Sequence, residues 1–127
     1  MLVRPLLAAV TLAAIAAGVD RPLTPGEARK KVGEAVTVEM TVRATKDRLQ
    51  KHGEIYLDSE EDFRDPKNFA VVITKVGVAQ FKKAGIGDPA GHFKGKTIRV
   101  SGRVKDVKGV PRIEVGDPGR LKVAKGR

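Results

Sequence analysis

The sequence predicts one small all-β domain with short helices. From residue 34 onward, several short segments alternate apolar and polar residues, which is the pattern of strands buried on one face. Glycine, proline, aspartate and asparagine separate those segments, as they do at turns. The 127 residues correspond to one domain, and 41% of them are hydrophobic, which is enough for a core. Because the chain has no cysteine, disulfide scaffolds, zinc fingers, iron–sulfur proteins and thiol enzymes are excluded.

The first 17 residues have the pattern of a secretory signal peptide. Arg4 precedes an apolar run that starts at Leu6, and small residues follow around Ala14 and Ala16. An uncleaved anchor or a buried first helix is the alternative. We therefore expect a signal peptide at 1–17, a folded domain at 18–123, a basic tail at 124–127, and a periplasmic or secreted protein.

A short helix is expected next, over residues 25–32. Thr24 and Glu27 form a capping-box pattern with Pro25 in the first helical position. Gly33 is a suitable residue to end the helix, because only glycine enters the left-handed region without strain.

Three strands are expected before residue 75. Residues 36–42 alternate, with valines and a methionine on one face, and 54–58 form a second short strand with Tyr56 opposite Ile55 and Leu57. Residues 69–74 are almost continuously apolar, as in a central strand. We expect residues 46–53 to be a polar, basic loop and residues 59–68 to be an acidic connection.

The second half predicts a helix and a hairpin. Residues 76–83 have helical spacing and are followed by glycines. Residues 96–104 alternate again, Lys108 and Gly109 indicate a tight turn, and 111–115 form the returning strand. One more extended segment is expected around Leu121 and Val123.

Five strands with a helix between the third and the fourth are the order of an OB-fold, a five-stranded Greek-key barrel. Gly102 in the fourth expected strand supports a barrel, because strands that bend strongly use glycine there. An open antiparallel sheet with two helices is the alternative.

The same segments resemble those of the tRNA-anticodon-binding-like OB-fold group and of small secreted or periplasmic OB-fold proteins of bacteria. The resemblance rests on VGEAVTVEMTV at 32–42, YLD at 56–58, KNFAVVI at 67–73, FKGKTIRVSGRV at 93–104 and GVPRIEV at 109–115. It covers residues 24–123 and implies the fold, because its motifs are structural glycines and strand patterns.

OB-folds bind oligonucleotides and oligosaccharides on strands two and three and on the two flanking loops. In this chain those loops are rich in cations, and the net charge of +10 would attract a polyanion. Tyr56 is the expected stacking residue and Phe69 a second one if it faces outward. Since most of the cations are lysines, no sequence readout is expected. The predicted binding residues are Arg43, Lys46, Arg48, Lys51, Tyr56, Phe69, Lys105, Lys108 and Arg112.

The sequence therefore predicts a non-catalytic module that binds single-stranded nucleic acid or another polyanion. In one alternative, the charge keeps the protein soluble. In another, the chain is an envelope, stress or protein-interaction protein, which the expected compartment favours because chromosomal DNA and RNA are absent there. The chain as an accessory part of a larger assembly is a third.

Enzyme, metal and cofactor sites are not expected. The acidic residues 58–62 lack the EF-hand spacing, and His52 and His92 stand alone in sequence. Residues 91–97 are one residue short of a phosphate loop and lead into a strand. A nuclease of the staphylococcal type, which also uses an OB barrel, is the strongest enzyme alternative. The residue types that it needs are supplied by Glu39, Asp58, Arg43 and Arg103.

Overall fold

A computed structural model describes residues 21–124, so the expected signal peptide at 1–17 and residues 125–127 of the expected tail lie outside the described residues. No helix within residues 21–124 is long and apolar enough to cross a membrane. The elements are, in chain order, α2 (Pro25–Ala28), β1 (Ala35–Thr41), β2 (Ala44–Arg48), β3 (Glu54–Asp58), β4 (Ala70–Ile73), α3 (Lys75–Lys83), α4 (Pro89–Phe93), β5 (Thr97–Val107), β6 (Val110–Val115), the 3-10 turn η1 (Pro118–Arg120) and β7 (Leu121–Val123).

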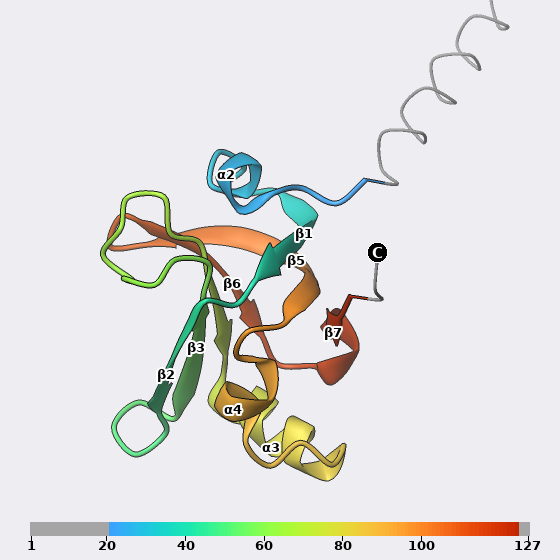
Figure 1. Cartoon of the computed structure of the whole chain (residues 1–127). Coiled ribbons are helices and arrows are strands. Elements are labelled where there is room, and N and C mark those ends of the chain that lie inside the picture. Colours follow the sequence, from blue (N-terminus) through green and yellow to red (C-terminus); the bar gives the residue numbers. More distant parts are fainter. Residues whose placement is uncertain (1–20, 125–127) are drawn as a thin grey trace, which may run out of the picture.

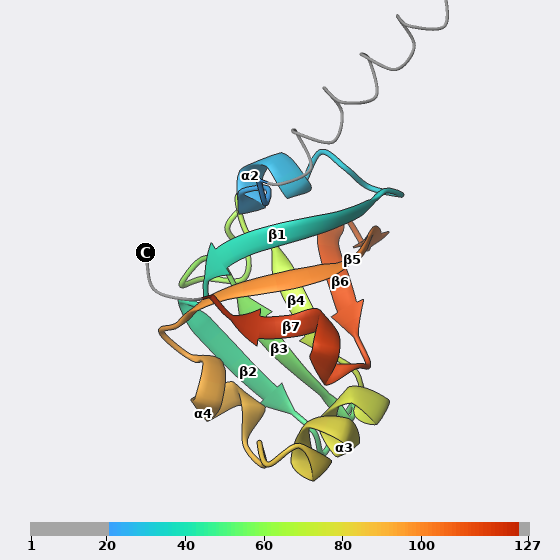
Figure 2. The same cartoon turned by 90° about the vertical axis from the view of Figure 1, so that its right-hand side faces the viewer.

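The protein is mostly β, as predicted, with the strands in the order β1-β5-β6-β4-β3-β2 and β7 added beside β5. The pair β4–β6 is parallel and the other named pairs are antiparallel. Only Val42 and Arg43 separate β1 from β2, so the two ends of this order are consecutive in the chain. Figure 2 shows β1, β5 and β7 crossing in front of the layer formed by β2, β3 and β4, and in Figure 1 β7 lies on the opposite side of the molecule from β2 and β3; α3 and α4 lie at one end in both views.

The sheet has seven strands within residues 21–124, where five strands and one further extended segment around Leu121 and Val123 were expected. That extended segment is β7, so the unexpected strand is β2.

The first strand, expected over 36–42, ends as β1 at Thr41, and Val42 and Arg43 lead directly into β2. The N–H of Val42 donates to the carbonyl oxygen of Lys96, just before β5, whereas the N–H of Arg43 donates to the carbonyl oxygen of Asp58 on β3. These two residues therefore mark the point where the chain changes its strand partner.

The prediction of a loop over 46–53 was wrong for its first half. Residues 44–48 form β2, paired along its length with β3. This strand carries no apolar residue larger than Ala44, so the alternation that identifies a strand is missing from its sequence. Its pairing with β3 holds it in place.

The predicted alternation elsewhere matches the core. Val38, Met40 and Val42 are buried along the first strand and its end, and Ile55 and Leu57 are buried on β3. Phe81 of α3 meets Phe93 edge to face, with ring centroids 5.7 Å apart. The short helix that carries Phe93, α4, was not predicted. Its buried proline, alanine and phenylalanine cover one end of the core.

The first helix begins as predicted and ends earlier. The N–H of Glu27 donates to Thr24 Oγ1 at 3.1 Å, and the N–H of Thr24 donates to Glu27 Oε1 at 2.9 Å, which completes the capping box. Gly33 has φ +93°. The helix ends at Ala28, not at residue 32. The N–H groups of Lys30 and Lys31 donate to carbonyls only three residues back, and Gly33 and Glu34 then hydrogen-bond to Val104 of β5.

Strand β5 connects the two layers. Its residues 97–103 pair with β1, and residues 104–107 pair with β6. Gly102 lies at this change, and a Cβ there would stand 2.7 Å from Cγ2 of Ile113. The predicted turn follows, with positive φ at both Lys108 and Gly109.

Candidate functional site

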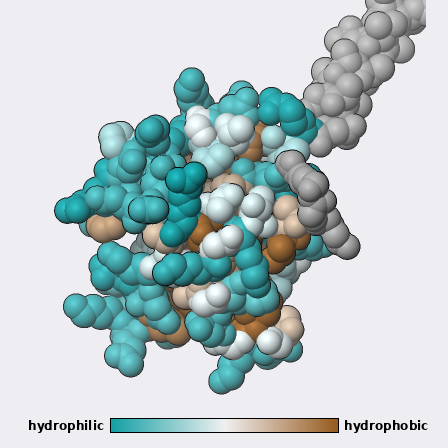
Figure 3. Space-filling model, in the orientation of Figure 1, coloured by the Kyte–Doolittle hydropathy of each residue, from teal (hydrophilic) through white to brown (hydrophobic). Residues whose placement is uncertain are grey.

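A cleft of about 380 Å³ surrounds Tyr56 on the outward face of β3, and we call it the tyrosine cleft. Its walls come from β2 and β3, from the β3–β4 loop and from the β5–β6 hairpin, which lie together on one side of the molecule in Figure 1. Figure 3 shows mostly hydrophilic side chains on this side, with smaller apolar patches between them. The lining residues are Lys46, Arg48, His52, Tyr56, Asp58, Phe63, Asn68, Ala70, Val107, Lys108, Val110 and Arg112.

Strand register sets the positions of these side chains. Lys46 of β2 is the partner of Tyr56 on β3, which places the cation beside the ring. In the next row, Asp58 is the partner of Ala70, and Ala70 is the partner of Arg112. Paired residues on neighbouring strands point to the same face, so both rows project into the cleft.

The ring of Tyr56 is half-buried and fixed by charged neighbours. Its hydroxyl donates to Glu54 Oε1 at 2.8 Å, and the Arg112 guanidinium carbon lies 5.8 Å from the ring centroid. Burial first, and then the hydrogen bond to Glu54, raise the pKa of Tyr56. The phenol therefore stays neutral at physiological pH.

The second aromatic residue of the site is Phe63, not Phe69. The prediction for Phe69 was wrong, because its side chain is fully buried in the core. Phe63 is 50% exposed on the β3–β4 loop, where Lys46 Nζ lies 4.1 Å from its ring centroid. The sequence did contain a signal for Phe63, because a phenylalanine is unusual inside an acidic, polar loop.

Acidic residues share this face, which the sequence reasoning did not take into account. Glu114 of β6 binds Lys105 at 3.3 Å and approaches Arg112 Nε at 3.8 Å. Asp58 lies buried in the cleft and Glu54 holds Tyr56. The positive field on this face is therefore weaker than the sequence predicts, and the ammonium of Lys105 is already paired with the carboxylate of Glu114.

Five of the nine predicted residues line the tyrosine cleft: Lys46, Arg48, Tyr56, Lys108 and Arg112. Lys51 is exposed in the turn between β2 and β3 and lines neither hollow described here. Arg99 and Arg103 of β5 also lie outside the cleft: Arg99 binds Glu39 at 2.8 Å, and Arg103 donates to the carbonyl of Gly33. The predicted convergence of cations was therefore only partly correct.

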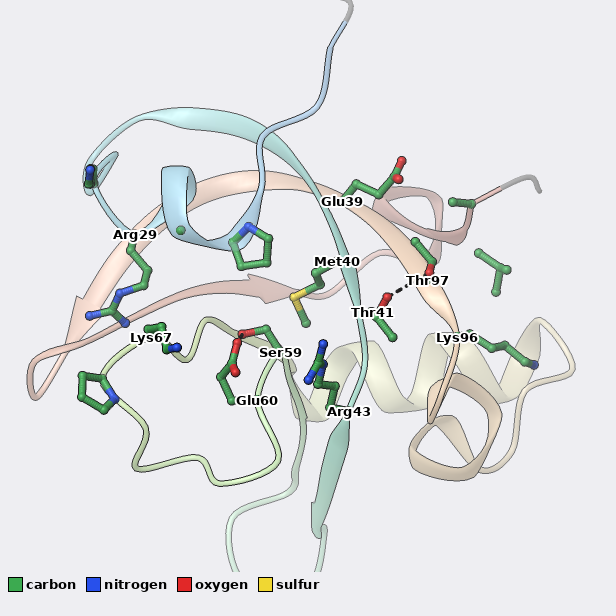
Figure 4. Close-up of a pocket in the computed structure, with 16 residues that line it drawn as sticks. Arg29, Glu39, Met40, Thr41, Arg43, Ser59, Glu60, Lys67, Lys96 and Thr97 are labelled. Carbon is green, nitrogen blue, oxygen red and sulfur yellow. Dashed lines mark hydrogen bonds between the residues drawn. The ribbon is translucent and has the colours of Figure 1, made fainter. Parts of the chain in front are cut away.

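Arg43 lies in a different hollow, the α2 groove, which has a volume of about 1190 Å³ (Figure 4). The groove lies between α2, β1, the start of β5 and the β3–β4 loop, and the hydroxyls of Thr41 and Thr97 meet at 3.1 Å in its wall. Although the α2 groove is larger, none of its lining residues is aromatic. The tyrosine cleft is thus the better candidate for a base.

Metal-ligating side chains do not gather within residues 21–124: no group of three histidines, cysteines, aspartates or glutamates could hold an ion there. His92 packs edge-on against Phe93, with ring centroids 4.7 Å apart. In the acidic loop, the Asp62 carboxylate accepts from Arg64 at 3.1 Å.

Comparison with known proteins identifies the type of fold. No family model and no curated protein matches the chain. Among solved structures it is similar to asparaginyl-tRNA synthetase from Pyrococcus horikoshii, with a TM-score of 0.53 and 22% identity over 84% of this chain and 24% of that one. It is also similar to an OBody solved bound to hen egg-white lysozyme, with a TM-score of 0.55 and 13% identity over 84% of this chain and 96% of that one.

The fold is of the OB type. At these identities the likeness shows the fold alone. The chain spans about a quarter of the synthetase that it matches.

Proposed function

We propose that the chain is a non-catalytic OB-fold module that binds single-stranded nucleic acid in the tyrosine cleft. The observation that carries this proposal is the position of Tyr56: its ring lies in a cleft whose rim holds Lys46, Arg48 and Lys108. The similarity to a tRNA synthetase of the OB type supports it.

Binding in this cleft combines two interactions. A base stacks on Tyr56 or Phe63, which contributes about 1–3 kcal/mol for each stacked base. The phosphates on either side meet the lysines and Arg48 at the rim, and counterion release adds affinity that falls as salt rises.

The proposal extends to architecture and location. Because β1 and β2 are consecutive and end the strand order on both sides, we interpret them as one bent first strand of a five-stranded Greek-key barrel. The N-terminal sequence pattern supports a periplasmic or secreted protein of the bacterial type.

The test is fluorescence anisotropy of a labelled thymidine oligonucleotide of about 12 residues with the full chain. Titrations at about 50 and about 200 mM salt, with heparin as competitor, distinguish the contribution of base stacking to the affinity from that of charge, because only the charge contribution falls steeply as salt rises. Tyr56→Ala is expected to weaken binding about tenfold, and Tyr56→Phe to retain it, because the second variant keeps the ring.

Two further variants complete the design. Phe63→Ala is expected to weaken binding while leaving stability unchanged, because half of this side chain is exposed. Lys82→Ala on α3, away from the cleft, is the control for loss of a cation. Binding that heparin abolishes and Tyr56→Ala leaves unchanged would contradict the proposal and favour a general polyanion or protein-interaction surface.

A further inference from the structure

Two polar side chains that are almost fully buried form the floor of the tyrosine cleft. Asp58 is 4% exposed and Asn68 is 2% exposed, and both line the cleft. Asn68 Nδ2 donates to Asp58 Oδ1 at 3.0 Å. The amide oxygen of Asn68 accepts from the N–H of Glu60 at 3.0 Å, which fixes the amide and leaves its donors for the carboxylate.

Asp58 has no ion pair within residues 21–124. The ammonium of Lys46 acts on it through space and lies over the ring of Phe63. Burial raises the pKa of Asp58. A carboxylate buried without a salt-bridge partner opposes folding, and such groups concentrate at binding sites.

The three side chains of this row face the same opening. Ala70 lies between Asp58 and Arg112 in register, and all three line the cleft of about 380 Å³, with only the methyl group of Ala70 between the carboxylate and the guanidinium strands. Since neighbouring strands are about 4.8 Å apart, the backbones of Asp58 and Arg112 are about 10 Å apart. Arg112 Nη1 is buried and has no hydrogen-bond partner among the described residues, so an acceptor beside it would satisfy that donor.

We propose that this floor selects guanine, with the Asp58 carboxylate accepting from the base and Arg112 donating to it. This inference rests on the proposed function and names the base that the same cleft prefers.

The chemistry of the bases decides the choice. Guanine presents two parallel donors, N1–H and N2–H, to a carboxylate and has the acceptors O6 and N7 for a guanidinium. Adenine and cytosine place a ring acceptor beside their amino group, and thymine flanks its single N–H with two carbonyl oxygens. Each of these would set an oxygen or nitrogen lone pair against Asp58.

An acid at the floor also orients the strand. The carboxylate repels phosphate, so the backbone stays at the rim with Lys46, Arg48 and Lys108 while the base points inward. A groove that only collected phosphates would gain nothing from this acid.

The experiment compares labelled thymidine oligonucleotides of about 12 residues that carry one central dG, dI, dA, dC or dT. A single guanine avoids self-association of guanine-rich strands. For the full chain we expect dG to bind about tenfold more tightly than dT, with dI between them because hypoxanthine lacks the N2 amino group. In Asp58→Asn we expect the preference for dG to be lost and the affinity for the dT strand to be kept. Asp62→Asn, in the exposed part of the adjoining loop, is the matched control and should keep the preference.

The outcomes separate the two proposals. Equal binding of all five strands overturns the guanine inference and leaves the proposed function standing, whereas binding of none overturns both. A preference for dG that persists in Asp58→Asn overturns the role of Asp58. If this variant does not fold, as judged by circular dichroism, the comparison of dG with dI in the unmodified chain decides, and equal affinities overturn the inference.

Discussion

The hydroxyl of Tyr56 donates a hydrogen bond of 2.8 Å to Oε1 of Glu54, two residues earlier on β3. The two side chains share one face of the strand because side chains alternate along it. The ring that we propose as the stacking platform is therefore anchored by an acid of its own strand. The guanidinium carbon of Arg112 lies 5.8 Å from the centroid of the same ring. This arrangement fixes the ring before any ligand arrives, which lowers the entropy lost on binding.

Replacing Glu54 by glutamine should lower the pKa of Tyr56 relative to the unmodified protein. The negative charge of Glu54 and its hydrogen bond both oppose ionisation of the phenol, and the substitution removes the charge. Because the chain has one tyrosine, the tyrosinate absorbance reports this group alone. Glu34→Gln, at the exposed turn before β1, is the control. Equal titration midpoints for Glu54→Gln and the unmodified protein would show that Glu54 does not anchor the ring.

Replacing Asp58 by asparagine should leave the protein as stable as before, or more stable by up to about 1 kcal/mol, at neutral pH. Burial raises the folded-state pKa of Asp58 above its unfolded value, so the stability that its protonation contributes is present at low pH and is lost as pH rises through the folded pKa. The variant lacks this dependence. Urea unfolding from about pH 3 to about pH 8 should show its advantage growing with pH. A loss of more than about 2 kcal/mol at neutral pH would mean that the carboxylate is a structural requirement.

The strands that the sequence predicted correctly are those with one face in the core. In β1, β3 and β5, burial of one face imposes a period of two, and Val38, Ile55 and Ile98 follow it. Strand β2 has no buried side chain, so its sequence shows no such period. Its hydrogen bonds to β3 keep it in the sheet. Nothing local to residues 44–48 could identify it.

The site could be predicted in part for a similar reason. Lys46, Tyr56 and Arg112 were found because the general position of binding strands in the fold is known. Phe69 is buried just before β4 begins at Ala70, whereas Phe63 is exposed in the loop, and the residue types around them do not distinguish the two environments. Pairing of Glu114 with Lys105 requires the register of β5 with β6, which only the folded structure supplies.

Replacing Glu114 by glutamine should strengthen binding of a single-stranded oligonucleotide about two- to tenfold at about 50 mM salt. The substitution releases Lys105, now 3.3 Å from Glu114 Oε1, and removes the acid nearest Arg112 Nε. The slope of log affinity against log salt should steepen by about 0.7 for the phosphate contact that Lys105 gains, because each additional phosphate contact in a single strand contributes about 0.7. Anisotropy titrations at several salt concentrations measure both quantities, and Glu34→Gln is the control for loss of an exposed acid. An unchanged slope would mean that Lys105 does not meet the phosphates of the bound strand.

Replacing Gly102 by alanine should destabilise the protein by about 1–3 kcal/mol. The new methyl group would stand 2.7 Å from Cγ2 of Ile113, which is fully buried in the core and has no room to move away. The strand must therefore separate from its neighbour where β5 changes its partner from β1 to β6. Gly87→Ala is the matched control: no atom lies within 4 Å of its added Cβ, so stability should stay equal or rise by up to about 1 kcal/mol. Urea unfolding midpoints measure both variants, and equal midpoints would show that β5 accommodates a side chain at this bend.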